Sequence, residues 1–193
     1  MTASSTRCCR RSSWLAAFTA LLLGFAAAAP ALAEGIEVRK AALITAEDGY
    51  FLEAEFDIAL THTLEDALNK GVPLYFDLEF ELIRRRWYWF NEKLANARQQ
   101  YRLSYNALTR HYRVGVGRLY QNFDTLAEAL AFLSRVRVRE IAEPGSFAKG
   151  AIYTAALRLR LDSSQLPRPF QVSAVGSREW SISSDWHRWT VSP

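Results

Sequence analysis

The chain has 193 residues and a formal net charge of +4, from 24 Lys and Arg against 20 Asp and Glu. Three of the arginines, Arg7, Arg10 and Arg11, lie in an N-terminal segment that we expect to be removed, and 21 basic and 20 acidic residues remain without them. A chain so close to neutral lacks the positive charge on which nucleic-acid affinity depends. Cys8 and Cys9, the only cysteines, lie in the same segment, so we expect neither a disulfide nor a cysteine metal site in the remainder.

That N-terminal segment has the layout of a secretory signal peptide. Its arginines precede an uncharged stretch that ends in Ala31-Leu32-Ala33 before Glu34, and small residues at this spacing are typical of a cleavage site. An uncleaved membrane anchor is the alternative, because the stretch is long enough to span a bilayer. We expect residues 1–33 to be removed as a signal peptide and residues 34–193 to form a single β-rich domain in the periplasm.

The first predicted elements are two strands, residues 36–46 and 50–60, around an Asp-Gly turn, which is a strong hairpin signal. A short helix follows, capped by Thr63 and ended by Gly71. Residues 72–83 are predicted to form a half-buried strand, because apolar and acidic residues alternate along it. The residues expected to face inward are Leu74, Phe76, Leu78, Phe80 and Leu82, and those expected to face outward are Asp77, Glu79 and Glu81.

The middle of the chain is predicted to contain a hairpin, a strand and a helix. Residues 87–93 and 100–107 form the hairpin across a loop at Asn96-Ala97, and residues 111–119 form the strand. The helix is capped by Thr125, and we expect Leu130, at the centre of its apolar stripe, to be buried against the sheet. The stripe consists of Leu126, Ala129, Leu130 and Leu133.

The C-terminal third is predicted to be mostly extended. Strands are expected over residues 136–141 and 148–161, a loop over 163–169, and a strand pair over 170–175 and 179–191. The chain then has about nine strands and two short helices. This content is typical of a mainly β protein that folds as an antiparallel β-sandwich or a small barrel.

Charged residues recur in rows along the predicted strands. Such carboxylates could form a cation site or an acid/base pair. Each acidic row lies opposite an apolar row, however, and arginine rows are available for cross-strand ion pairs, so we interpret both as solvated outer faces. The acidic rows are Glu53, Glu55 and Asp57, and Asp77, Glu79 and Glu81; the arginine rows are Arg135, Arg137 and Arg139, and Arg158 and Arg160.

The most unusual segment is residues 84–90, in which three arginines precede four aromatic residues. One interpretation is a strand end whose aromatic residues fill the core beneath the arginines. The other is a recognition surface, because Arg and Trp are enriched at binding hot spots. Tryptophans near the C-terminus raise the same question. The candidate interaction surface consists of Arg84, Arg86, Trp87, Trp89, Trp186 and Trp189.

No sequence motif indicates catalysis. The three histidines, His62, His111 and His187, have no metal-ligand spacing, and the chain contains no nucleophile-elbow, zinc-protease or phosphate-loop motif. We therefore expect no catalytic residue, no cofactor and no bound metal, and we do not expect an enzyme.

Several segments between Ile36 and Val191 together resemble domain-of-unknown-function family 4390, small exported proteins of Gram-negative bacteria. The resemblance implies a periplasmic domain associated with genes for a nitrogen-regulation-type membrane sensor kinase, and it supplies no activity, cofactor or catalytic residue. The segments are Gly71-Val72-Pro73-Leu74-Tyr75-Phe76, Arg86-Trp87-Tyr88-Trp89, Leu103-Ser104-Tyr105-Asn106-Ala107-Leu108-Thr109, Leu159-Arg160-Leu161-Asp162 with Leu166-Pro167, and Trp180-Ser181-Ile182-Ser183-Ser184-Asp185-Trp186.

The function that we expect is a non-catalytic interaction or accessory module for a membrane sensor or an envelope complex. Its partner would be an envelope or membrane protein, and the domain would not stay inserted in the membrane after signal cleavage. A carbohydrate- or peptidoglycan-binding module that uses exposed Trp186 and Trp189 is the alternative, and an enzyme of unknown class is a further one.

Overall fold

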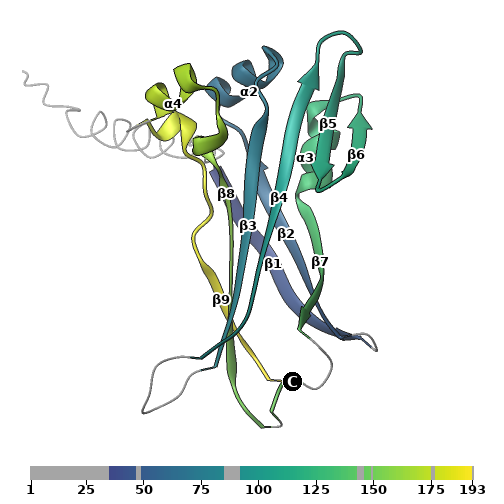
Figure 1. Ribbon diagram of the computed structural model, residues 1–193, viewed down its shortest axis with the longest axis vertical. Helices are drawn as coiled ribbons and strands as arrows, with labels where there is room; N and C mark the ends of the chain where they lie inside the picture. The colour runs from purple at the N-terminus through teal and green to yellow at the C-terminus, as the bar shows by residue number, and fades with distance from the viewer. Residues whose placement is uncertain are drawn as a thin grey trace, which may run out of the picture. The chain divides into compact units, whose positions relative to one another are not determined.

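A computed structural model describes residues 35–46, 49–84, 92–142, 146–148, 150–174 and 177–192 (Figure 1). The chain divides into two units, Met1–Leu32 and Ala33–Pro193. The first unit lies outside the described residues, so the fold below is that of the second.

The smaller of two antiparallel sheets has three strands in the order β1-β2-β7. β1 (Gly35–Ala46) and β2 (Gly49–Ala59) form the expected hairpin, and β7 (Arg135–Ala142) pairs with the other edge of β2. The register of β1 shifts between Val38 and Lys40, where a β-bulge interrupts the pairing.

The larger sheet has six strands in the order β6-β5-β4-β3-β8-β9. Its centre is formed by β3 (Leu74–Arg84), with β4 (Glu92–Asn106) on one side and β8 (Tyr153–Leu161) on the other. β5 (His111–Val116) and β6 (Leu119–Phe123) extend it beyond β4, and β9 (His187–Val191) extends it beyond β8.

The inner faces of the two sheets share one hydrophobic core. The alternation predicted for β3 is confirmed, because all five of its apolar residues are buried, as are Leu52 and Phe56 of β2 and Leu157 and Leu159 of β8. Two separate sheets that meet through one core define a sandwich. The prediction of a mainly β, sandwich-like fold is confirmed, and its barrel alternative is not the observed form.

Two helices occur where the sequence predicts them. In α2 (His62–Asn69) the cap is Thr61 instead of Thr63, and the Thr61 hydroxyl accepts from the Leu64 N–H. In α3 (Leu126–Leu133) the cap is Thr125, as predicted, and it accepts from the Glu128 N–H.

The expected burial of Leu130 is wrong, because its side chain is only half-buried. The α3 residues that are fully buried against the core are Ala129 and Leu133. The face of α3 that packs on the core is therefore centred on Ala129 and Leu133, and Leu130 lies at the side of that face.

Three further predictions require correction. β4 runs without a break through Asn96-Ala97, which pair with Glu81 and Phe80 of β3. The strand predicted over residues 111–119 is the β5–β6 hairpin, which turns at Gly117 (φ 59°). The long strand predicted from residue 148 begins at Tyr153, since the Ala148 N–H donates to the Tyr153 hydroxyl and a turn follows it.

The strand predicted over residues 170–175 is instead the helix α4 (Arg168–Ala174). Pro169 lies in its first turn, where a residue without an N–H is tolerated, whereas the same residue would interrupt a strand ladder. The 3₁₀ turns η2 (Ser163–Gln165) and η3 (Arg178–Trp180) flank this helix, and Phe170 packs on buried Trp180 with ring centroids 5.3 Å apart.

Candidate functional site

The outer face of the six-stranded sheet contains a buried carboxylate network. Asp77, on the central strand β3, has a side chain that is 1% exposed. It accepts hydrogen bonds from Arg98 Nη2 at 2.6 Å, Gln100 Nε2 at 3.0 Å and Arg160 Nη2 at 3.4 Å. The prediction that Asp77 lies on a solvated face is wrong, because these longer side chains from β4 and β8 cover it.

Glu79 continues the network one row along β3. It accepts from Arg158 Nε at 3.1 Å and from Arg160 Nε at 3.0 Å. Partial burial works against its ionised form, yet the hydrogen bonds and positive charges of the two arginines outweigh that effect and lower the pKa of Glu79. The expected cross-strand pairing of this acidic row with the arginines of β8 is thus confirmed.

Three arginine–aromatic pairs lie on the same outer face. The guanidinium carbon of Arg158 lies 4.6 Å from the ring centroid of Trp186, that of Arg102 lies 5.8 Å from Tyr75, and that of Arg113 lies 5.9 Å from Tyr120. Contacts within about 6 Å are in the range of cation–π attraction. The pairs occur in both halves of the sheet, which makes the whole face rich in Arg and aromatic side chains.

One cross-strand row forms a groove on this face. Tyr75 of β3 pairs in register with Arg102 of β4, which pairs with Gly115 of β5, which pairs with Tyr120 of β6. These residues line a hollow of ≈ 630 Å³. The Tyr120 ring lies directly over Gly115, because a Cβ on Gly115 would meet it at 2.6 Å. The glycine therefore allows an exposed aromatic ring to approach the backbone of β5 closely.

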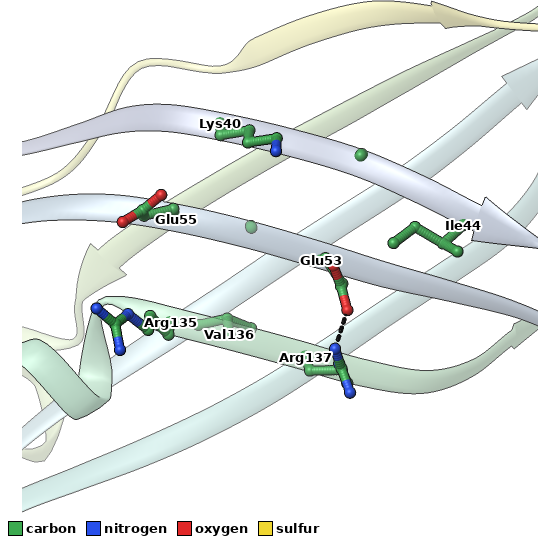
Figure 2. A pocket seen from close by; sticks show the side chains of 9 residues that line it. Lys40, Ile44, Glu53, Glu55, Arg135, Val136 and Arg137 are labelled. Carbon is green, nitrogen blue, oxygen red and sulfur yellow. Dashed lines mark hydrogen bonds and ion pairs between the residues drawn. The ribbon is translucent and has the colours of Figure 1, made fainter.

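The outer face of the three-stranded sheet has a smaller hollow of ≈ 330 Å³ (Figure 2). Arg137 of β7 and Glu53 of β2 form an ion pair there, in register with each other, and Glu55 pairs in register with Arg135. Lys40 and the partly exposed Ile44 of β1 complete the rim. Three basic side chains and two carboxylates line this hollow, so most of its charge is compensated within it.

The candidate surface inferred from the sequence is only partly described. Arg86, Trp87 and Trp89 lie outside the described residues, and Arg84 is half-buried at the end of β3.

Trp186 and Trp189 are both half-buried and differ in surroundings. Trp189 packs inward on Phe80, with ring centroids 6.2 Å apart. The Trp186 ring contacts the guanidinium group of Arg158 and borders a cleft of ≈ 320 Å³ beside β1. The two tryptophans therefore do not form one flat stacking surface.

The groove residues Tyr75, Arg102, Gly115 and Tyr120 were missed by sequence reasoning. The only local signal was Gly115, since a glycine inside a strand often marks close approach of another group. The other three residues come together through the pairing of four strands, which the pattern along any single strand does not reveal.

Within the described ranges, no three His, Cys, Asp or Glu side chains are grouped as metal ligands would be. Among the same residues, no helix has the length and apolar character needed to cross a bilayer.

The fold and this face define a class: an antiparallel β-sandwich protein with an arginine–aromatic surface on its larger sheet. The chain belongs to the family described as domain of unknown function DUF4390, whose model matches residues 33–190. No curated protein and no solved structure matches it.

Proposed function

We propose that this protein is an exported, non-catalytic interaction module that binds an envelope or membrane protein, such as a membrane sensor or an envelope complex. The signal-peptide pattern of residues 1–33 supports export to the periplasm. The contact surface in this proposal is the outer face of the six-stranded sheet.

The observation that carries the proposal is the presence of three arginine–aromatic pairs on that one face. Arg, Tyr and Trp are the residue types most enriched at hot spots of protein interfaces. The Asp77–Glu79 network supports the surface from below, because it holds Arg158 and Arg160 at fixed positions. Side chains already ordered before binding lose less conformational entropy when a partner docks.

Affinity capture of the full-length tagged protein from envelope extract, at native abundance, tests the proposal. Specific partners should be recovered with the wild-type protein and lost with Trp186→Ala, which removes the ring under Arg158. Arg139→Gln, on the exposed outer side of β7, is the matched surface control and should recover the same partners.

Recovery of no specific partner would contradict the proposal. So would equal recovery by the wild-type protein and by a variant that combines Arg102→Gln, Arg158→Gln and Trp186→Ala, because that variant disrupts two of the three pairs. Cell fractionation that places the tagged protein in the cytoplasm would contradict the exported location.

A further inference from the structure

The β5–β6 end of the larger sheet carries more positive than negative charge, because the carboxylate that follows β6, that of Asp124, lies 3.1 Å from His111 Nε2 and contacts none of the arginines. Residues 102–123 contain four arginines and no Asp or Glu, although basic and acidic residues after position 33 are nearly equal in number. Within the described part of the chain, none of the four forms an ion pair with a carboxylate. The four are Arg102, Arg110, Arg113 and Arg118.

The strand at this end is an open edge. β6 is the last strand of the sheet, and four of its five residues are exposed, with Leu119 at 79% and Tyr120 at 56% (Figure 1). Proteins protect such edges with charges, prolines or bulges, because unpaired backbone groups there can pair with another chain. β6 has none of these devices, whereas β1 has a bulge and β7 carries three arginines.

The turn of the hairpin determines which backbone groups are free. Gly117 has a φ of 59° and Arg118 an ordinary negative φ, so a two-residue turn with glycine first joins Val116 to Leu119. The residues that flank such a turn face each other across the ladder, and hydrogen-bonded positions then alternate. The backbone groups of Tyr120 and Asn122 therefore point away from β5, toward the open edge.

We propose that β6 is the docking edge for an extended acidic segment of a partner protein. The inference rests on the proposed function and names the part of the surface and the chemistry of the partner. The partner segment adds a strand by hydrogen bonding to Tyr120 and Asn122, and alternate carboxylates of that segment lie on the outer face, on the side of Arg113, whose guanidinium extends over the Tyr120 ring of β6.

The open edge favours a polypeptide over other anions. A polysaccharide or a lipid headgroup could pair with the arginines, but only a peptide backbone can continue the ladder at the spacing of a β-sheet. The exposed Tyr120 ring, which lies close against Gly115, offers apolar contact to the same added strand. An acidic extended segment thus satisfies the charge, the backbone groups and the aromatic surface together.

Fluorescence anisotropy with the full chain tests this inference. The probe is a short labelled peptide of alternating Glu and Thr. Two comparison peptides isolate its features: the same peptide with alternate backbone nitrogens methylated, which cannot form a ladder, and a Lys-Thr peptide of opposite charge. We expect the Glu-Thr peptide to bind, and methylation or charge reversal to weaken binding by about tenfold or more, equivalent to ~1.4 kcal/mol.

Two charge-matched variants locate the site on the protein. Arg113→Gln/Arg118→Gln, on β5 and in the turn that leads into β6, should weaken binding of the Glu-Thr peptide by about tenfold. Arg139→Gln/Arg188→Gln removes the same charge from exposed positions on β7 and β9 and should leave binding within about twofold, because exposed charges far from the ligand are screened by salt.

Several outcomes would overturn the inference. One is absence of peptide binding up to millimolar concentration. Another is equal binding of the methylated peptide together with displacement by polygalacturonate, which would indicate a general anion site. If envelope capture retains its partner with Arg113→Gln/Arg118→Gln, the docking edge is refuted while the interaction function stands. If the wild-type protein captures nothing, the function itself fails.

Discussion

Stability should respond asymmetrically to the two sides of the Asp77 network. Asp77 is nearly inaccessible, whereas the side chain of its partner Arg98 is 60% exposed and that of Arg160 is 31% exposed. Loss of the carboxylate leaves two arginines that water can reach. Loss of both arginines leaves a buried carboxylate with only Gln100 as a hydrogen-bond donor.

These two situations differ in free energy. Removing one partner of a buried ion pair costs roughly 3–5 kcal/mol when the remaining charge stays buried. We expect Arg98→Gln/Arg160→Gln to lower the free energy of unfolding by about that amount, since Asp77 is the charge left behind. Asp77→Asn keeps the shape and one acceptor, and its partners can rehydrate, so we expect about 1–2 kcal/mol, close to the loss of a single charged hydrogen bond.

Urea unfolding followed by tryptophan fluorescence measures both values. Arg39→Gln, which removes an exposed ion pair with Asp57 on the other sheet, is the control and should leave the midpoint unchanged within error. The argument is refuted if Asp77→Asn destabilises the protein as much as the double arginine variant, because the cost would then come from packing around the carboxylate and not from its unpaired charge.

Three other results are expected. Leu133→Ala should lower the free energy of unfolding by about 2–5 kcal/mol and half-buried Leu130→Ala by clearly less; equal costs would show that exposure is a poor guide in α3. Gly115→Ala should displace the Tyr120 ring and weaken binding of the Glu-Thr peptide, with the unfolding midpoint as its folding control. The pKa of Glu79 is lowered on folding, so its contribution is present above the unfolded value of 4.5 and is lost as pH falls through the lower folded value. The unfolding midpoint, measured as a function of pH, should therefore fall below about pH 4.5 in the wild-type protein. In Glu79→Gln the midpoint should fall less steeply over the same range.

Local patterns explain why some elements could be predicted from the sequence. The alternation of apolar residues in β3 needs no knowledge of its neighbours, because a half-buried strand has a period of two. The cap of α3 is equally local, since Thr125 bonds to a residue three positions on. The hairpin of β1 and β2 could likewise be predicted from a local signal, the Asp-Gly dipeptide between two apolar runs.

The errors arise where distant pairing decides the structure. Asn96-Ala97 has turn-like composition, yet β3 pairs with this segment along its whole length and holds it extended. Gly115 and Tyr120 belong to different strands of a hairpin whose turn the sequence pattern does not reveal, so the groove could not be assembled from the sequence. Asp77 alternates with inward-facing apolar residues along β3, so the sequence pattern alone predicts that it is exposed. Only its pairing in register with Gln100 and Arg160 shows that neighbouring side chains cover it.

Arginines have different roles in the two halves of the outer face of the six-stranded sheet. Carboxylates of β3 neutralise the arginines of β8, and the resulting network stabilises the fold. No carboxylate occurs in β5 or β6, so Arg113 keeps its charge available for a ligand. Two strand spacings, roughly 10 Å, separate β3 from β5. Effects of substitutions at that distance usually add, so Asp77→Asn and Arg113→Gln should change unfolding and peptide binding independently of each other.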